Sequence, residues 1–420
     1  MQLEATSGRD LTEWVRTWLR TAGVNTLSPV LEIEGDVYKS IKVKQLAPTM
    51  PVGSTELRPH RLKVGLYDIA NDKLSRRKNV ELDIAGALTE VTGLAGEKAA
   101  DLVLVNDGDQ TYAKLRFDDR SIATMKSHLG KLDDSLSRGL IWASLWDSTR
   151  DGELAASDYV TIALNALAGE TDITTVTMTV TQIEGAIWSF ASDANREKLR
   201  EQAANAFEKF FDSATAGSDH QLQYAKAFAD FAYTPAQFEK IKAILNGSIN
   251  GLTVDADLRW FVFICGVKRG IFNATDIETE AAKDVTAHGK QYVALAHAAL
   301  PSAAAKAAAF KAITTDNLSN TIHAYTCRGF NLAIHRELLV PFVDKYFESI
   351  LEVWETKGFE IAETTATLLF PAWVISEETL KKAEHWLAVT GKDASHAMRR
   401  TVAEGRDSMT RSLKARAADK

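Results

Sequence analysis

Residues 102–119 read LVLVNDGDQTYAKLRFDD and contain the last strand-like pattern of the chain. Leu102 and Leu104 precede Asn106-Asp107-Gly108-Asp109, a strong turn signal of β-hairpins, and the strand pattern resumes from Tyr112 to Phe117. This stretch therefore predicts two strands joined by a tight turn at the end of a β-rich region.

On the N-terminal side of this stretch, apolar and polar residues alternate with a period of two from about residue 27. The alternating sets are Leu31 and Ile33, Leu62, Val64 and Leu66, and Val80, Leu82 and Ile84. Prolines and glycines separate these runs, which is typical of short antiparallel strands. Residues 27–119 are therefore predicted to form a small antiparallel β-sandwich domain.

On the C-terminal side, the alternation ends after Asp119. The following residues form successive amphipathic segments of helical period, punctuated by glycine and proline. Such a rhythm is typical of helical hairpins stacked side by side, so residues 120–420 are predicted to form an α-solenoid of the HEAT or armadillo type. Because no clean repeat consensus is visible, a compact irregular helical bundle is the alternative.

Residues 8–26 have a helical pattern of their own. Leu11, Trp14, Val15, Trp18 and Leu19 share one face, with Asp10 placed as a cap, Glu13 as the third residue of a capping box, and Gly23 as a terminator. A single helix cannot bury two tryptophans by itself. We expect this face to pack on the next domain or on a partner outside the chain.

Composition limits the possible functions. The 420 residues correspond to about 2.8 domains of ~150 residues. A net charge of −7 does not provide the basic surface that nucleic acid requires. Only Cys265 and Cys327 are present, no secretory signal is visible, and the longest apolar run, Trp260–Val267, is too short to span a membrane. We expect a soluble, cytoplasmic protein that binds neither nucleic acid nor membrane.

The sequence contains no motif for phosphate binding, for a nucleophilic serine or for a catalytic zinc ion, since H-E-x-x-H is absent. His323 and Cys327 are four residues apart, and His335 and Glu337 follow. A zinc enzyme built on His323, Cys327 and His335 is one hypothesis, but a buried helix face is favoured. The basic C-terminal stretch, which includes Arg399, Arg400, Arg411 and Arg416, is interpreted as a solvated helix or as a surface for acidic peptides.

Several stretches together resemble one family. Residues 8–27, GRDLTEWVRTWLRTAGVNTL, are similar to the end of the catalytic domain in bacterial zinc aminopeptidases of the aminopeptidase N family, particularly the actinobacterial type. The resemblance continues through Leu104–Asp109, Arg138–Trp142 and Arg328–Phe330, and covers nearly the whole chain, but only the C-terminal half of that architecture.

The resemblance implies a family that removes single amino acids from peptide N-termini with one zinc ion. The zinc motif and the other catalytic residues of the family belong to domains that precede Gly8, so no catalytic residue, metal ligand or cofactor is assigned to this chain. The matching part is the β-sandwich and a helical bowl that encloses peptide substrates. Arg328 and Phe330 are the candidate substrate-binding residues, although Asn331 stands where the family often has tryptophan.

The resulting hypothesis is a chain that encloses and gates peptides for an aminopeptidase and is inactive alone. Residues 1–26 would be the terminal helix of a missing or separate catalytic domain, which would dock near Trp14 and Trp18. An excised half, an internally started product and a split protein are all compatible with this hypothesis. The alternative function is a stand-alone solenoid that acts as a scaffold or binds peptides without catalysis.

Overall fold

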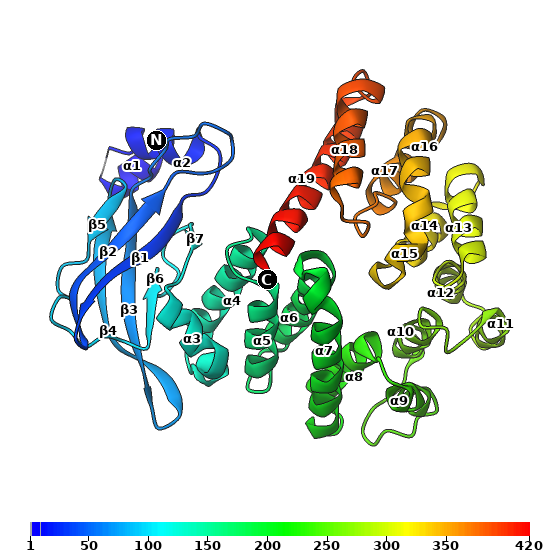
Figure 1. Cartoon of the computed structure of the whole chain (residues 1–420), viewed down its shortest axis with the longest axis horizontal. Coiled ribbons are helices and arrows are strands. Elements are labelled where there is room, and N and C mark those ends of the chain that lie inside the picture. Colours follow the sequence, from blue (N-terminus) through cyan, green and yellow to red (C-terminus); the bar gives the residue numbers. More distant parts are fainter. Residues whose placement is uncertain (1, 9) are drawn as a thin grey trace. The chain divides into compact units, whose positions relative to one another are not determined.

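The computed structural model describes residues 2–8 and 10–420. They form two compact units: an N-terminal unit up to Thr149 together with Thr161–Thr175, and a C-terminal unit of Arg150–Val160 and Val176–Lys420. A β-rich region is followed by a long helical region, as the sequence predicts (Figure 1). The predicted domain boundaries after residues 26 and 119 stay predictions, because compactness and a change of secondary structure are different criteria.

The N-terminal unit is built around two β-sheets. Its strands are β1 (Thr26–Glu34), β2 (Val37–Leu46), β3 (His60–Ala70), β4 (Lys73–Ile84), β5 (Leu88–Glu90), β6 (Leu102–Val105) and β7 (Lys114–Leu115). One sheet has the order β5-β2-β1-β7 and the other β4-β3-β6, and their apolar faces form one core. The sandwich is confirmed, and its sheets are antiparallel except for the short parallel pair β1–β7.

The alternation in β3 places its apolar residues as predicted. Leu62, Val64 and Leu66 are fully buried between the sheets, and Val64 lies opposite Val80 of β4 and Val105 of β6. Ile33 of β1 differs, because it is 43% exposed. The register of β1 against β2 shifts between Glu32 and Ile33, and a bulge of this kind changes which residues face the core.

The predicted hairpin at Asn106–Asp109 is wrong. The turn is present, with positive φ at Asn106, Gly108 and Asp109, but β6 pairs with β3 and β7 pairs with β1, so the turn crosses between sheets. The cause is Asp107, whose side chain is fully buried. Its carboxylate accepts a hydrogen bond of 2.7 Å from the Tyr67 hydroxyl and forms an ion pair of 3.0 Å with Arg76.

A glycine makes room for this carboxylate. A Cβ atom on Gly65 of β3 would lie 2.5 Å from Asp107 Oδ2 and 2.9 Å from the Tyr67 ring. Such distances are far below van der Waals contact, so only glycine fits at this position while Asp107 is inside. The turn therefore joins the sheets through a buried polar contact rather than ending a hairpin.

The helix predicted at residues 8–26 is shorter than expected. Residues 2–26 contain α1 (Gln2–Ser7) and α2 (Thr12–Leu19). Asp10 Oδ1 accepts a hydrogen bond of 2.9 Å from the Thr12 N–H, but Glu13 pairs with Arg16 at 2.6 Å and does not complete a capping box. The helix ends before Gly23, whose φ of +87° belongs to the following turn.

Helices in the N-terminal unit follow the strands. They are α3 (Asp119–His128), the 3-10 turn Leu129–Lys131, α4 (Ser135–Arg150), and parts of α5 (Ala156–Leu167) and α6 (Ile173–Gly185), which the unit boundary crosses. Asp118 caps α3 by accepting from the Ser121 N–H. Arg138 of α4 and Glu170 form a buried, two-pronged ion pair with distances of 3.0 and 3.1 Å. This pair ties α4 to the loop after α5.

The C-terminal unit consists of paired helices that follow one another along the chain (Figure 1). After α6 they are α7 (Asp193–Ser213), α8 (Asp219–Phe231), α9 (Pro235–Leu245), α10 (Ala256–Val267), α11 (Ala274–Ala281), α12 (Ala287–Ala298), α13 (Ala303–Thr315), α14 (Asn320–Phe330), α15 (Arg336–Leu339), α16 (Val343–Thr356), α17 (Phe359–Leu368), α18 (Glu377–His385) and α19 (His396–Ala418).

Polar caps explain where many of these helices begin. The side chains of Ser218, Asp255, Thr286, Ser302 and Ser395 each accept a main-chain N–H in the first turn of α8, α10, α12, α13 and α19. Helices α8, α10, α12, α14 and α17 each contact the next member of this series, and the intervening helices pack beside them. This arrangement confirms the predicted solenoid-like architecture.

A buried lysine joins two successive helix ends. Lys306 of α13 is fully buried, and its ammonium donates to the carbonyl oxygens of Ala298 (2.7 Å), Gly329 (2.9 Å) and Phe330 (2.9 Å). These acceptors lie at the C-terminal ends of α12 and α14, where helix carbonyls lack partners within the helix. In its ammonium form, Lys306 therefore supplies the three donors that these ends need.

The last helix returns to the start of the C-terminal unit. Asp419 is fully buried, and its carboxylate accepts hydrogen bonds from the main-chain N–H groups of Ser157 (2.9 Å) and Ser192 (2.8 Å) and from the Asn195 amide (3.2 Å). Ser157 lies in the first turn of α5, and Ser192 is the N-cap of α7. A single side chain at the end of α19 thus satisfies donors of two earlier helices.

Two helices end in π-turns, at Ala186–Phe190 after α6 and at Trp386–Thr390 after α18. Each turn is closed by a hydrogen bond of 2.7 Å over five residues, from the Ala191 N–H to the Ala186 carbonyl oxygen and from the Gly391 N–H to the Trp386 carbonyl oxygen. Each also contains a tryptophan, Trp188 or Trp386. π-turns of this kind are frequent at functional sites.

Candidate functional site

The three candidate zinc ligands do not form one site. His323 and Cys327 lie on the buried face of α14, where His323 Nε2 is 3.0 Å from the Thr365 hydroxyl and Cys327 Sγ is 3.9 Å from His323 Nδ1. Burial lowers the pKa of His323 and raises the pKa of the Cys327 thiol to about 12, so the thiolate that metals bind is disfavoured. These two side chains are part of the helix core, as the sequence favoured.

His335 lies in a different environment. Its Nε2 is 2.8 Å from the main-chain carbonyl oxygen of Lys268, to which it donates, and burial lowers its pKa to about 4. Within residues 2–8 and 10–420, no group of three or more histidine, cysteine, aspartate or glutamate side chains is arranged to hold a metal ion. The residues described therefore do not fit the zinc ion that the family resemblance implies elsewhere.

Arg328 and Phe330 have opposite environments although both lie on α14. Arg328 is exposed, and its guanidinium lies 5.3 Å from the centre of the Tyr325 ring. Phe330 is only 3% exposed and packs against Phe310 and Phe342. The Arg328 side chain is therefore accessible from solvent, whereas Phe330 belongs to the core at the end of α14.

Beside Arg328, aromatic side chains that are at least partly exposed extend from α14 to α12, where they pack on the buried Trp260 of α10. The Tyr325 ring lies 5.7 Å from Tyr292, which in turn stacks on Trp260 at 5.7 Å. His288 lies 4.8 Å from the Tyr292 ring, and Tyr292 donates to Asp257 at 3.3 Å. We call Arg328, Tyr325, Tyr292 and His288 the aromatic strip. Its rings and its guanidinium provide stacking surfaces and hydrogen-bond donors for an extended chain.

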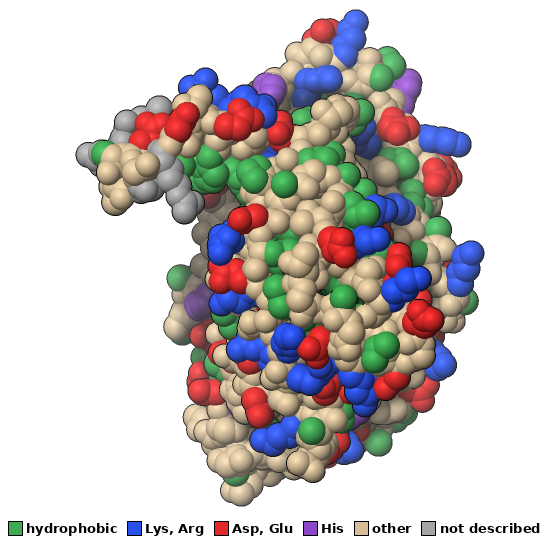
Figure 2. All heavy atoms as spheres, turned by 90° about the vertical axis from the view of Figure 1, so that its left-hand side faces the viewer, with side chains coloured by type: hydrophobic (Ala, Val, Ile, Leu, Met, Phe, Trp, Pro, Cys, Tyr) green, Lys and Arg blue, Asp and Glu red, His purple; other side chains and the backbone are tan. Residues whose placement is uncertain are grey.

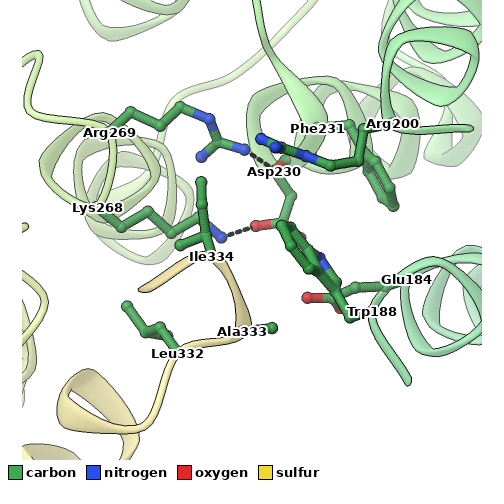
Figure 3. A pocket seen from close by; sticks show the side chains of 10 residues that line it. All are labelled: Glu184, Trp188, Arg200, Asp230, Phe231, Lys268, Arg269, Leu332, Ala333 and Ile334. Atoms are coloured by element: carbon green, nitrogen blue, oxygen red, sulfur yellow. Dashed lines mark hydrogen bonds and ion pairs between the residues drawn. The ribbon is translucent and has the colours of Figure 1, made fainter. Parts of the chain in front are cut away.

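A second polar site is a small internal cavity in the C-terminal unit. Figure 3 shows Lys268 joined to Asp230, with Glu184 close to them and the loop that carries Leu332 to Ile334 at the side of the cavity. Lys268 pairs with the Asp230 carboxylate, and Arg269 donates to the carbonyl oxygens of Ala232 (2.7 Å) and Asp230. The cavity has a volume of about 40 Å³. This volume holds a few water molecules but no peptide.

The two carboxylates of this cavity differ in charge. Burial alone would raise the pKa of Asp230, but Lys268 and Arg269 outweigh this effect and lower it. The negative charge of Asp230, followed by burial, raises the pKa of Glu184 to about 7. Asp230 therefore stays ionised while Glu184 exchanges a proton near neutral pH. Sequence analysis missed this cluster, for which the only signal was charged residues beside apolar ones, as in Ala-Asp-Phe at 229–231.

The tryptophans of α2 are covered unequally. Trp18 packs edge-on against His60 at 5.2 Å and lies 5.5 Å from the Arg58 guanidinium, so it belongs to the N-terminal unit's own packing. Trp14 is 39% exposed, and Leu19 is 66% exposed. We call Trp14 and Leu19 the α2 apolar surface. Burial lowers the pKa of His60 to about 4, so this histidine stays neutral beside Trp18.

The charged side chains visible in Figure 2 are of both signs and interspersed. On the β3–β4 surface, Arg61 pairs with Glu81 and Asp83, each at 2.9 Å, and Arg77 pairs with Asp68 at 2.5 Å. The face drawn in Figure 2 shows no continuous basic patch. No helix among the described residues is long and apolar enough to cross a membrane.

Comparison with known proteins explains this architecture. The family model described as "ERAP1-like C-terminal domain" matches residues 102–411. Over 425 aligned residues, the chain is 41% identical to Aminopeptidase N of Streptomyces lividans, covering 99% of this chain and 49% of that protein. The chain thus spans about half the length of the curated relative it matches. It belongs to the aminopeptidase N family and contains the family's ERAP1-like C-terminal domain.

Proposed function

We propose that this chain encloses and gates peptides for an aminopeptidase of the N type and does not hydrolyse them by itself. The observation that carries the proposal is the match to Aminopeptidase N over 99% of the chain but only 49% of the relative. Zinc-dependent chemistry would then come from a catalytic part outside the matched half. The described side chains support this division of labour because they do not fit a zinc ion.

The α2 apolar surface is the proposed docking site of that catalytic part. The proposed occupant is the other half of an aminopeptidase N-type protein, because this chain matches only 49% of that relative. Trp14 and Leu19 offer exposed apolar side chains, and Arg16 beside them already pairs with Glu13 and Glu56. A large aromatic side chain at the centre of a contact is typical of residues that dominate binding energy.

The aromatic strip is the proposed peptide contact within the helical region. Arg328 is exposed and makes no ion pair within residues 2–8 and 10–420, so its donors are available to peptide carbonyl or carboxylate groups. Phe330 would act indirectly, because its buried ring fixes the end of the helix that carries Arg328. This assignment retains both residues that the sequence singled out, with different roles.

Hydrolysis is tested with the purified chain, zinc and an aminoacyl-anilide substrate. We expect no turnover with the chain alone, and turnover when a separately produced catalytic part of an aminopeptidase N-type protein is added. Chelator-sensitive turnover by the chain alone would contradict the proposal. Failure of the two parts to associate, combined with tight peptide binding, would instead favour a stand-alone peptide-binding solenoid.

Docking and peptide contact are tested by matched variants. Trp14→Asp should abolish co-elution with the catalytic part, whereas Tyr112→Ser, at a residue 74% exposed in the same unit, should not. Arg328→Ala should weaken peptide binding several-fold in fluorescence anisotropy, with Arg400→Ala as the control. Equal effects of the test and control variants would remove the proposed roles of Trp14 and Arg328.

A further inference from the structure

A groove in the C-terminal unit lies between the start of α7, the α15 turn, residues 373–375 and the end of α19. Its volume is about 240 Å³, and its walls include Asp193, Arg336, Glu337, Val340, Trp373 and Arg416. We call it the arginine groove. This volume is sufficient for a side chain with part of its main chain, in contrast to the water-sized cavity at Glu184.

Arg416 is held at the groove by main-chain oxygens. Its guanidinium donates to the carbonyl oxygens of Trp188 (3.0 Å), Ser189 (3.1 Å) and Ile375 (3.4 Å). Carbonyl groups orient the guanidinium without neutralising its charge. A guanidinium has five N–H groups, so two remain for a ligand. The basic C-terminal stretch thus includes one arginine that is positioned inside the fold.

Other arginines of the same stretch are committed elsewhere. Arg399 donates to the carbonyl oxygens of Leu387 and Gly391, Arg400 pairs with Glu404 at 2.7 Å, and Arg411 pairs with Asp407 at 3.0 Å. The stretch is therefore not a uniform basic surface. Among these four arginines, Arg416 is the one that lines the groove.

Arg336 approaches the groove from a second element. Its Nε donates to Glu337 at 3.2 Å, but that carboxylate is 82% exposed and largely solvated. The four N–H groups on its terminal nitrogens make no hydrogen bond to the residues that the structure describes. The Arg336 guanidinium lies 6.0 Å from the centre of the Trp188 ring, and this contact restricts where the arginine side chain can lie. Arg336 therefore presents its forked end to the groove.

Positive charge exceeds negative charge around the groove. Arg196 is 1% exposed and pairs with Asp193, whose side chain is 83% exposed. The groove itself is lined by two guanidiniums, of Arg336 and Arg416, and by two mostly solvated carboxylates, of Asp193 and Glu337, while the buried Arg196 adds a third positive charge behind Asp193. Burial, followed by the charges of Arg196 and Arg336, lowers the pKa of Arg416 to about 10. An additional anion in the groove would relieve this repulsion.

Apolar side chains also line the groove. Val340 is 50% exposed, and Trp373 is fixed by a hydrogen bond of 3.0 Å from its indole N–H to the Asn331 carbonyl oxygen. Val374 and Ile375 extend this apolar lining. The groove therefore combines a guanidinium pair with an aliphatic and aromatic surface. A small inorganic anion would use only the first of these features.

We propose that the arginine groove binds an acidic side chain, aspartate or glutamate, of an extended peptide that carries an apolar residue next to it. The carboxylate would accept hydrogen bonds from Arg336 and Arg416, and the apolar neighbour would contact Val340 and Trp373. This inference rests on the proposed function, because it names a class of peptide that the helical region would favour.

The test compares two short labelled peptides whose termini are both blocked. They are identical except that one contains Leu-Glu and the other Leu-Gln at the centre. Fluorescence anisotropy with the full chain should give about tenfold tighter binding of the Leu-Glu peptide, because a charge-assisted pair contributes more than a neutral one. Arg336→Gln should bring the two affinities together, and Arg336→Lys should retain part of the difference.

Arg336 is preferred for substitution because Arg416 also supports main-chain oxygens. Arg400→Gln is the control and should leave the preference unchanged. Equal affinities of the unaltered chain for the two peptides would overturn the inference but not the proposed function. Binding of neither peptide would contradict both. Binding that requires a free C-terminus and ignores the Glu/Gln change would also overturn the inference, because the recognised carboxylate would then be the terminal one.

Discussion

The Asp419 carboxylate accepts a hydrogen bond of 2.8 Å from the main-chain N–H of Ser192, 227 positions earlier in the chain. The same carboxylate accepts from Ser157 at 2.9 Å. The end of α19 is therefore a structural component of the region where α5 and α7 begin. Because the side chain is fully buried, water cannot replace it.

Asp419→Ala should destabilise the C-terminal unit by about 3 kcal/mol, since two main-chain N–H groups would lose a charged, buried acceptor. Urea denaturation followed by circular dichroism measures the loss. Lys420→Ala, at the exposed next residue, is the control and should have no effect. A stability equal to that of the unaltered chain would show that other groups satisfy these donors.

Asp419 also predicts a pH dependence. Burial would raise its pKa, but the hydrogen bonds from Ser157, Ser192 and Asn195 outweigh burial and lower the pKa below the ordinary 3.8. Its stabilising contribution is therefore complete above about pH 4 and is lost as the pH falls through the lower folded value. The difference in unfolding free energy between the unaltered chain and Asp419→Ala should shrink in acid.

Glu184 predicts the opposite dependence near neutral pH. Asp230, followed by burial, raises its pKa from 4.5 to about 7, so the folded state binds more protons than the unfolded state between these values. The unfolding free energy should fall as the pH rises through this interval. Glu184→Gln should therefore stabilise the chain by about 2 kcal/mol at pH 8 and change it little at pH 5.

Denaturation at the two pH values measures this effect. Glu201→Gln, at an exposed residue of α7, should not show the difference. If Glu184→Gln were neutral at both pH values, the coupling between the Glu184 and Asp230 carboxylates would be refuted.

Lys306 gives a third pH-dependent prediction. Burial lowers its pKa from 10.5 to about 7, so the unfolded state binds more protons between these values and stability should rise with pH there. The slope should approach 1.4 kcal/mol per pH unit and be absent in Lys306→Met. Lys311→Met, on the same helix, is the control. An unaltered chain without this slope would mean that the three carbonyl acceptors keep the ammonium charged.

The turn between the two sheets predicts a contrast between two glycine substitutions in the N-terminal unit. Gly65→Ala should destabilise by about 3 kcal/mol, because its Cβ would displace the buried Asp107 carboxylate. Gly139→Ala in α4 meets no atom within 4 Å and should stabilise by about 0.5–1 kcal/mol. Thermal unfolding of both variants measures this contrast. Similar melting temperatures of the two variants would contradict the claim that the buried Asp107 carboxylate stabilises the turn.

Periodicity was sufficient to predict the class of each region. Leu62, Val64 and Leu66 could be assigned to the core because a strand places every second residue on the same face. Asn106–Asp109 could not be assigned correctly from pattern alone. Its residues favour a tight turn in either topology, and the buried contacts of Asp107 with Tyr67 and Arg76 decide which strands it joins.

The candidate sites were predictable only in part. Arg328 was selected through family resemblance and lies on an exposed strip, whereas Phe330 lies in the core. The arginine groove unites residues of α15 and α19 that are 80 positions apart, Arg336 and Arg416. No local spacing links such residues, since their proximity depends on how the last helix returns to the earlier ones.

The π-turns at Ala186–Phe190 and Trp386–Thr390 have an evolutionary consequence. Each accommodates one residue more than an ordinary helical turn at the point where its helix ends. A single-residue deletion, which in most helices turns every later side chain to a wrong face, would here convert the turn to standard α geometry. We therefore expect related chains to tolerate a difference of one residue in length at these two helix ends, without rebuilding the helices around them.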